Sequence, residues 1–443
     1  MKKRVLSVLL VSAMTASLFA GCGNDTAAPS DGTQAGGSTA AVSSDDPNTL
    51  TVYAWDANFN IPALEAAEAD YKANVNPDFN LEIIEQSQSS DVEDAITLAG
   101  SSGDYSNLPD IVLFQDHYFQ QYVTNYPDAF IPVDDAEVDW SDFGAEKLSF
   151  STINGSHYGF PVDNGTVIFA YRTDLLAEAG YTIDDMTGIS WADFITVGKE
   201  VYAKTGKYLL SMDGSGNDLM YMMLQAEGVS QFKDGAPYVT ENETLVEVMQ
   251  ILDEMVKENV LYLANDWGDY TNQTIVNDMV AGVMNGNWII PTIESVPENS
   301  GKWEITSMPT LAGGEGYASN GGSSLYITGN CQKTDLAKDF LAKTFGGSKE
   351  TYDAALKNGG VITCCISAGE SDVYSQGVDY FNGQPIYAKI VEMGSHVKVV
   401  EQNDYHYDMR SQLSTALINA RDGADLMEEL KAAEDNIKFT MGL

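Results

Sequence analysis

The sequence has few basic residues and little histidine or cysteine, and each shortage excludes a class of function. Lys and Arg number 23 against 65 Asp and Glu in 443 residues, which gives a formal net charge of −42. Such an acidic surface repels the phosphates of nucleic acids and of anionic lipids. The sequence therefore predicts no nucleic-acid partner. Four His and four Cys are also too few and too scattered for most metal scaffolds.

Motifs that bind nucleotides or mark common hydrolases are absent as well. No GxxxxGK(S/T) loop, HExxH or GxSxG occurs, and no GxGxxG follows a strand candidate. The segment that begins at Asp56 resembles a calcium loop, but Ile61 stands where that loop needs glycine, and the segment from Asp213 fails in the same way at Asp218. We expect no metal and no cofactor.

The chain has one long apolar run, and it lies at the amino terminus. Basic residues at positions 2–4 precede the apolar residues 5–20, which is typical of an export signal and predicts a signal peptide over residues 1–21. The run ends in LFAGC, which is similar to the lipobox of bacterial lipoproteins and implies that Cys22 is lipidated. Phe19 departs from the usual Leu of that motif. The alternative is that Cys22 is an ordinary thiol.

A tether is predicted between this signal and the folded body. Residues 22–48 begin with Cys22 and continue with small and polar residues that have almost nothing to bury. Fully stretched, the tether reaches about 90 Å at about 3.3 Å per residue. A lipid at Cys22 would therefore hold a freely moving body at a membrane.

Short β-type runs alternate with helical patterns from residue 49 onward, which predicts an α/β fold. The strand candidates are residues 50–54, 81–84, 110–114, 166–171 and 323–328. The helix candidates are residues 63–73, 90–100, 191–204, a helix after 243, helices from 335 and 349, and residues 405–439 with a break at 422–423. Ser90 with Glu93, Ser190, and Thr240 with Glu243 are the expected helix caps.

The remaining cysteines leave two alternatives open. In an exported chain Cys331 can form a disulfide with Cys364 or Cys365. The other interpretation is three small buried thiols. No histidine or other base has an evident place beside any of them, so none is expected to be a nucleophile.

Eight short motifs follow one another in an order typical of one family. They are YAWD at 53–56, PDIVLF at 109–114, NGSHYGFP at 154–161, AYRTDLL at 170–176, ISWADF at 189–194, VAGVMNGNW at 280–288, MP at 308–309 and KTDLAKDFLAKTF at 333–345. Together they resemble the extracellular solute-binding proteins of ABC importers, in the large sugar-binding group that includes maltose-binding protein. Asp278 and Gly282 depart from the usual Gly and Met of the sixth motif.

The resemblance implies a fold and a function. The fold is a two-lobed periplasmic-binding-protein-like α/β fold with hinge crossovers and a ligand cleft between the lobes. The lobes are expected over 49–162 plus 308–366 and over 163–307 plus 367–443. The implied function is a monomeric receptor without catalytic activity, which carries a mono- or oligosaccharide to the transmembrane subunits of an ABC permease.

Residue chemistry points to candidate ligand contacts at the strand ends. Ligands of α/β sheets bind beyond the carboxyl ends of strands, where Trp55, Asp56, Gln115 and Asp116 stand. Sugars need hydrogen bonds from polar side chains and stacking on aromatic rings. The further candidates, some of them implied by the resemblance, are Asp163, Asn164, Asp213, Trp267, Trp288, Gly321 with Gly322, Tyr405 and Arg410.

Two other functions stay open. The carboxylates of Asp56, Asp116, Asp163 and Asp213 also suit a cationic solute such as a polyamine. An exported glycosidase would need two carboxylates about 5–9.5 Å apart that flank a glycosidic bond. No spacing in the sequence singles out such a pair.

Overall fold

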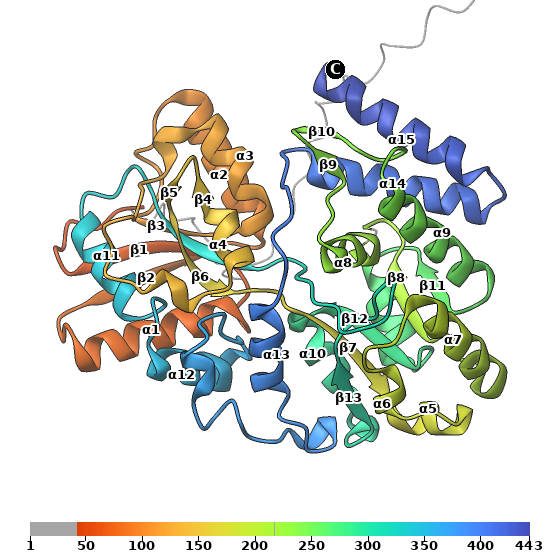
Figure 1. Cartoon of the computed structure of the whole chain (residues 1–443). Coiled ribbons are helices and arrows are strands. Elements are labelled where there is room, and N and C mark those ends of the chain that lie inside the picture. Colours follow the sequence, from red (N-terminus) through yellow and green to blue (C-terminus); the bar gives the residue numbers. More distant parts are fainter. Residues whose placement is uncertain (1–41, 217) are drawn as a thin grey trace, which may run out of the picture. The chain divides into compact units, whose positions relative to one another are not determined.

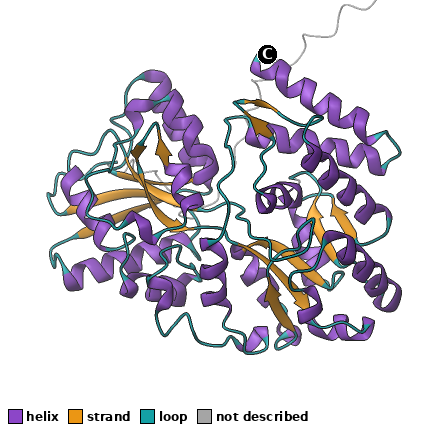
Figure 2. Ribbon diagram, viewed as in Figure 1, coloured by secondary structure: helices purple, strands orange, loops and turns teal. Residues whose placement is uncertain are grey.

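Two groups of β-strands, each flanked by helices, organise the described part of the chain: one is a five-stranded sheet, and the other contains a three-stranded sheet and smaller ones (Figures 1 and 2). The structure is a computed structural model that describes residues 42–216 and 218–443. The predicted signal peptide, Cys22 and the tether up to residue 41 lie outside the described residues. We call the elements around the five-stranded sheet, together with the short hairpin β4–β5 (Thr152–Ile153, Ser156–His157), the first lobe, and those around the remaining sheets the second lobe.

The sheet of the first lobe brings four chain segments to one edge. Its strands lie in the order β2-β1-β3-β14-β6. Their bounds are β1 Thr49–Ala54, β2 Asn80–Glu85, β3 Ile111–Gln115, β6 Gly159–Asp163 and β14 Ser323–Ile327. β1, β2 and β3 are parallel, and β14 runs antiparallel to β3 and to β6. The carboxyl ends of β1, β3 and β6 therefore meet the start of β14 at one edge.

Both faces of this sheet are covered, which explains its continuous apolar strands. In β3, Ile111 and Leu113 face one core cluster, whereas Val112 and Phe114 face another. The first cluster packs against α1 (Asn60–Asn74), α11 (Thr334–Lys343) and α12 (Lys349–Gly359). The second packs against α2 (Ser89–Ser102) and α3 (Asp116–Asn125). The short helix α4 (Ala145–Ser151) lies beside α3 and β6.

The second lobe is built on β7, whose alternate residues also face two clusters. Phe169 and Tyr171 lie in one cluster and Ile168 and Ala170 in the other. The strands are β7 Val167–Arg172, β8 Leu210–Asp213, β11 Leu261–Ala264, β12 Gly282–Gly286 and β13 Trp303–Thr306. The order is β12-β7-β13 in one sheet and β11-β8 in another, and a short hairpin is β9–β10 (Phe232–Lys233, Ala236–Pro237).

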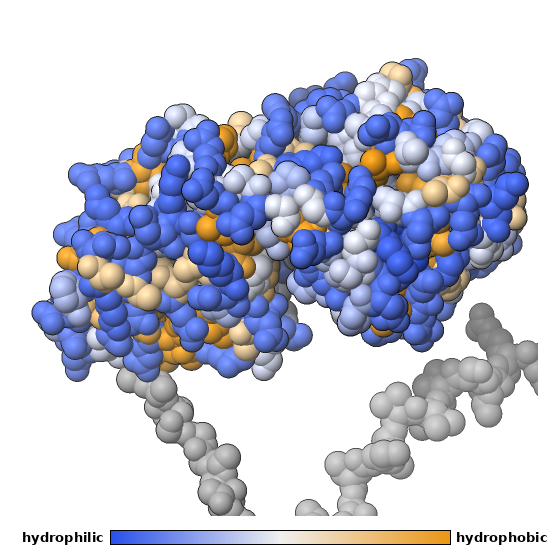
Figure 3. Space-filling view, turned by 90° about the horizontal axis from the view of Figure 1, so that it is seen from below, coloured by the Kyte–Doolittle hydropathy of each residue, from blue (hydrophilic) through white to orange (hydrophobic). Residues whose placement is uncertain are grey.

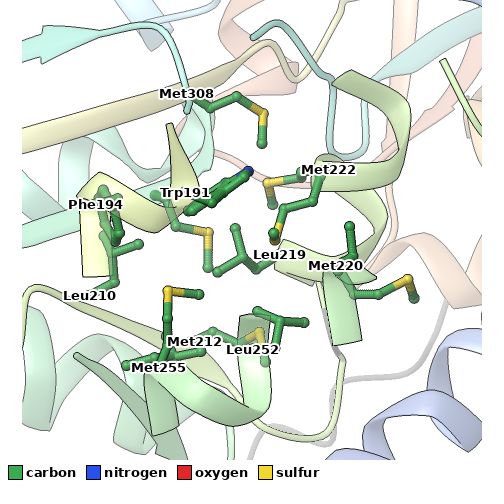
Figure 4. Close-up of a cluster of buried hydrophobic side chains, with 14 of the residues drawn as sticks. Trp191, Phe194, Leu210, Met212, Leu219, Met220, Met222, Leu252, Met255 and Met308 are labelled. Carbon is green, nitrogen blue, oxygen red and sulfur yellow. The ribbon is translucent and has the colours of Figure 1, made fainter. Parts of the chain in front are cut away.

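A methionine-rich core fills the space between β7 and the helices of the second lobe. Figure 4 shows Trp191 and Phe194 among Met212, Met222 and Met255. The helices on this side are α5 Thr173–Ala179, α6 Ile183–Met186, α7 Trp191–Thr205, α8 Asp218–Glu227, α9 Glu243–Lys257, α14 His406–Arg421 and α15 Leu426–Met441. The other side holds the π-helix η3 Asp269–Val276, α10 Ile290–Glu294 and α13 Ile386–Ser395.

Two paired segments cross between the lobes. One continues β6 into β7, and the other leads from β13 to β14. They are joined by Asn320 N donating to Gly165 O (2.9 Å) and Val167 N donating to Ala318 O (2.9 Å). The segment that follows α12 is a third crossing, because Cys365 packs in the core of the first lobe and Tyr374 in that of the second.

The structure confirms most predicted elements and corrects two caps. Ser190 accepts from Asp193 N, and Gly206 ends α7 in the left-handed conformation, as expected. The caps at Ser90 and Thr240 are wrong. Gln88 forms the capping box of α2 with Asp91, and Asn242 caps α9, because each of these side chains lies directly before the first helical residue. Thr240 instead bonds Glu434 of α15.

The strand β6 is absent from the predicted elements because it contains Pro161, which lacks a backbone donor. Cys331, Cys364 and Cys365 are free and buried, which agrees with the second cysteine alternative. Across residues 42–216 and 218–443, no helix combines the length and the apolar character that a membrane span requires. Most of the face in Figure 3 is hydrophilic, in line with the acidic composition.

Candidate functional site

A cavity of about 620 Å³ lies at the edge of the first sheet where the four segments meet. Pockets of this size accommodate small-molecule ligands. Both lobes contribute to its wall. The lining residues are Trp55, Asp56, Asn58, Phe59, Asn60, Gln115, Asp163, Asp218, Trp288, Pro291, Asn320, Gly321, Gly322, Ser323, Gly359, Tyr407 and Arg410.

The turn after β1 supplies one part of the wall. Asp56 has a left-handed backbone (φ 66°), and its Oδ1 accepts a hydrogen bond from Asn58 N (3.0 Å). Its carbonyl accepts from Phe59 N and Ile61 N, so the turn leads directly into α1. Trp55 packs against both cores of the first lobe, which fixes the position of the turn. The carboxylate of Asp56 is exposed and available to a ligand.

The start of β14 is held by a buried ion pair beneath the cavity. Asp116 bonds Lys147 Nζ, and its Oδ1 accepts from Ser324 Oγ (2.8 Å). Lys147 Nζ also donates to Ser323 O (2.8 Å). Both side chains are about 1% exposed or less. Because its two oxygens are engaged this way, Asp116 supports the wall from behind and does not line the cavity.

Glycine is required where β14 begins. Gly322 has φ +99°, and a Cβ there would lie 2.8 Å from Asp116 Oδ2 and 3.0 Å from Asp163 O. Asp163, at the end of β6, lines the cavity and accepts from Ser323 N through Oδ1 (3.0 Å). Burial raises the pKa of Asp163 to about 6, although the charge of Lys147 opposes the shift.

The second lobe contributes an aromatic ring and a guanidinium. Trp288, in the turn before α10, donates from Nε1 to Asn320 O (2.9 Å), and its ring lies 5.5 Å from that of Trp267. Arg410 of α14 is 3% exposed, bonds Asp218, and donates from Nε to Gly216 O (3.2 Å). Burial lowers the pKa of Arg410 to about 10. The cavity therefore offers a partly buried aromatic ring together with charged and amide groups.

An aromatic cluster joins the two lobes beside this wall. His117 of α3 stacks on His406 of α14, with ring centres 5.2 Å apart and planes at 12°. Its Nδ1 lies 3.1 Å from the hydroxyl of Tyr407. The ring of Tyr118 stacks on Tyr407 at 4.8 Å. We call these four residues the lobe-bridging cluster. Burial lowers the pKa of His406 to about 3 and that of His117 well below its ordinary value.

The structure brings seven of the predicted site residues to the cavity, together with Gly322. They are Trp55, Asp56, Gln115, Asp163, Trp288, Gly321 and Arg410. Five other predicted site residues lie elsewhere. Asp116 is buried under β14, and Asn164 bonds Thr166 in a crossing segment.

Asp213 accepts from Ser215 N and Oγ in its own turn. Trp267 is 44% exposed beside Trp288, and Tyr405 packs against the second-lobe core. Among the residues that the sequence missed, Asn58 and Asn60 stand in the same turn as Asp56, so the strand-end rule could have found them. No local signal marks Asp218 or Tyr407, because helices remote in sequence carry them into the wall.

Within residues 42–216 and 218–443, no group of three or more His, Cys, Asp or Glu side chains is placed to hold a metal ion. The cavity carboxylates are spread among other partners: Asp218 is paired with Arg410, and Asp163 with a backbone amide. The arrangement suits a ligand recognised by hydrogen bonds and ring stacking.

Comparisons with known proteins agree with this geometry. Residues 66–382 match the sequence profile of a family described as bacterial extracellular solute-binding protein. The chain is 32% identical over 389 residues to a lactose-binding protein of Rhizobium radiobacter, covering 87% of this chain and 91% of that protein. It is 23% identical over 363 residues to an arabinooligosaccharide-binding protein of Halalkalibacterium halodurans, covering 78% and 79%.

The fold is also found among solved structures. The sugar-binding protein MalE from Xanthomonas citri superposes with a TM-score of 0.73 at 16% identity, covering 88% of this chain and 96% of that one. This likeness shows the two-lobed fold. On the extent of the family match and the identity to its relatives, the chain belongs to the bacterial extracellular solute-binding proteins.

Proposed function

We propose that this chain is the receptor of an ABC importer and binds a mono- or oligosaccharide in the cavity. The observation that carries the proposal is the pairing of Trp288 with the carboxylate of Asp56 and the side chain of Gln115 around a cavity of about 620 Å³. The apolar face of a sugar ring stacks on an aromatic side chain, while its hydroxyls bond carboxylates and amides. The names of the two curated relatives point to oligosaccharides of the lactose and arabinose kinds.

Calorimetry on the protein without its signal peptide tests the proposal. Lactose, arabinooligosaccharides and spermidine are titrated separately, the last as a probe for a cationic solute. Binding of a sugar with no new reducing ends supports a receptor. Binding of spermidine alone would support the cationic alternative, and release of reducing ends would identify a glycosidase.

A pair of tryptophan variants tests the site itself. Trp288→Ala removes the proposed stacking ring and is expected to weaken sugar binding by about 30-fold or more, which corresponds to about 2 kcal/mol. Trp303→Phe is the matched control, since Trp303 is 2% exposed in the core of the second lobe. The control should lower the melting temperature and leave the affinity unchanged. The opposite pattern would place the site elsewhere.

We also propose the lobe boundaries. Those near 162/163 and 366/367 follow the sequence prediction: Tyr374 and Phe381 share a core with Ile168 of β7, which supports the second of them. We place the third boundary near residue 318 instead of 307/308, because Met308 and Ala318 pack in the core of the second lobe. Met308 is seen there beside Trp191 in Figure 4.

A lipid on Cys22 is proposed to hold the receptor at the outer face of the cell membrane. The support is the LFAGC sequence and the small, polar composition of residues 22–48. Cys22→Ser should release the protein into the medium or leave the uncleaved precursor. Unchanged attachment that only detergent dissolves would contradict the anchor.

A further inference from the structure

The contacts of His117 are a feature of the structure that ligand binding alone does not explain. This side chain belongs to α3 of the first lobe and does not line the cavity. Its nitrogens nevertheless face two hydroxyls of the second lobe: Nδ1 lies 3.1 Å from Tyr407 Oη, and Nε2 lies 3.5 Å from Tyr221 Oη. A first-lobe imidazole is thus held by tyrosines from α14 and α8.

Those two tyrosines hold the cavity guanidinium between them. The Arg410 guanidinium carbon lies 5.3 Å from the ring centre of Tyr221 and 5.2 Å from that of Tyr407. Tyr407 and Arg410 both line the cavity. A continuous set of contacts therefore runs from His117 through the two tyrosines to the ligand-facing side chains, and it exists only while the lobes are together.

The surroundings of His117 disfavour a positive charge on its ring. Its ring stacks on His406 of α14 and meets the edge of Phe150 of α4. Burial is the largest influence against protonation of the imidazole, and its electrostatic interactions with His406, Arg410 and Lys147 act in the same direction.

The carboxylates on the packed elements are engaged elsewhere. Asp116 of α3 is paired with Lys147, Asp218 of α8 with Arg410, and Glu146 of α4 bonds Ser319 and Gln225. No carboxylate is within hydrogen-bond distance of His117 among the described residues. Protonation of the ring would therefore place a positive charge without a carboxylate partner in the buried contact between the lobes.

We propose that His117 positions Tyr407 and Arg410 against the ligand across the lobe boundary, and that it does so only while its ring is neutral. The proposal rests on the proposed function and adds a pH dependence to it. Opening the lobes separates His117 from its second-lobe partners and exposes it to water, where an imidazole has a pKa of about 6.5. Acid then favours the open form, because the open form binds the proton more readily.

The expected loss of ligand affinity follows from the difference in the pKa of His117 between the open and the closed form. The ligand affinity has its full value well above pH 6.5 and falls by up to tenfold for each pH unit below pH 6.5. One such imidazole gives a loss of about 30-fold between pH 7.5 and pH 5.0. Protonation of His406 in the open form would steepen the dependence further.

Calorimetric titration of lactose at pH 7.5 and 5.0 tests the proposal on three proteins. The parent should lose about 30-fold in affinity at the lower pH. His117→Phe keeps a ring but has neither the hydroxyl contacts nor the titration, so it should bind more weakly at pH 7.5 and show a flatter profile. His157→Phe is the matched control: His157 is also a buried first-lobe histidine, but it bonds Thr152 of its own lobe. It should keep the slope of the parent.

Failure of the two proposals can be told apart. If lactose binds but the parent has the same affinity at both pH values, or His117→Phe keeps the slope of the parent, the role of His117 is refuted and the receptor function stands. If lactose does not bind at either pH, the choice of sugar fails, and the same titrations are made with an arabinooligosaccharide. The parent and His157→Phe should then lose about 30-fold between pH 7.5 and pH 5.0, and His117→Phe should show a flatter profile. Equal affinities of the parent at both pH values would overturn the proposal, and binding of neither sugar would overturn the proposed function with it.

Discussion

Glu146 is a buried carboxyl at the junction of the lobes and the crossing segment. It is 1% exposed, and its Oε1 accepts from Ser319 Oγ (2.5 Å) and from Gln225 Nε2 (3.0 Å). Among the described residues, its Oε2 has no hydrogen-bond partner. Burial raises the pKa of Glu146 to about 7, although these hydrogen bonds oppose the shift. The folded protein therefore favours the protonated, uncharged form of this side chain.

Glu146→Gln should change how stability depends on pH. Between the unfolded pKa of about 4.5 and the folded pKa of about 7, the folded state holds a proton that the unfolded state has released. The contribution of Glu146 to stability is thus complete below pH 4.5 and is lost as the pH rises to 7. Relative to the parent, the Gln variant should be more stable at pH 8 than at pH 4.5, as measured by urea unfolding.

Glu434→Gln provides a control of opposite sign. Burial raises the pKa of Glu434, but hydrogen bonds from Lys438 and Thr240 outweigh it and hold the pKa below its ordinary value. Its contribution to stability is therefore present above pH 4.5 and lost in acid, so this variant should be less stable than the parent at pH 8. Parallel stability curves for the parent and Glu146→Gln would contradict the assignment for Glu146.

At the scale of single residues, the sequence predicts which side chains lie near strand ends better than it predicts where those side chains point. Trp55, Asp56 and Gln115 reach the cavity because they end parallel strands. Asp116 follows β3 just as closely, yet it turns inward because Lys147, 31 positions away, meets it beneath β14. A partner so far along the chain leaves no local signal. The same limit hid Tyr407, which enters the wall only through the packing of α14.

At the scale of helices and strands, the contact between α3 and α14 joins the lobes beside the cavity. Tyr118, in the first turn of α3, stacks on Tyr407 with planes at 27°. Tyr122, one turn later, meets Phe114 and Tyr126 of its own lobe. Two tyrosines of one helix therefore serve different purposes: one contacts the opposite lobe, and the other packs on the sheet below.

These two tyrosines allow a matched test of the helix contact. Tyr118→Ala removes the stack on Tyr407, so ligand affinity should fall by about fivefold or more, in keeping with about 1 kcal/mol for an aromatic pair. The loss should appear as faster ligand release, with little change in melting temperature. Tyr122→Ala should lower the melting temperature and leave affinity within twofold. Equal affinity losses in both variants would mean that α3 acts only through its own fold.

The sequence also predicted the helices and strands better than it predicted which of them lie side by side. Apolar runs such as 110–114 identified the buried strands, because a strand covered on both faces needs side chains of one kind. The order β2-β1-β3-β14-β6 joins β14 to β3 across more than 200 residues. Nothing local encodes that pairing. It could be expected only from the family resemblance, which the fold comparison supports.

On the scale of the whole molecule, the two lobes are linked by few segments. The segments around Gly165 and Asn320 pair through backbone hydrogen bonds, and a buried Asn320–Asn285 bond (2.7 Å) ties the second of them to β12. Backbone changes in such short crossings are enough for a hinge motion. The ligand wall is divided between the lobes, so bringing them together completes the cavity.

Ligand binding should therefore favour the closed arrangement of the lobes. A sugar that contacts Trp55 and Asp56 on one side and Trp288 on the other gains both sets of contacts only when the lobes are close, and this difference in affinity shifts the equilibrium. Small-angle scattering at pH 7.5 should show a smaller radius of gyration with saturating lactose than without it. Trp288→Ala, at the same lactose concentration, should show a smaller decrease because fewer molecules are occupied. Calorimetry on the same samples gives the occupancy. A parent protein that binds lactose to saturation with an unchanged radius would show that the lobes are already closed without ligand, and the hinge would then have no part in recognition.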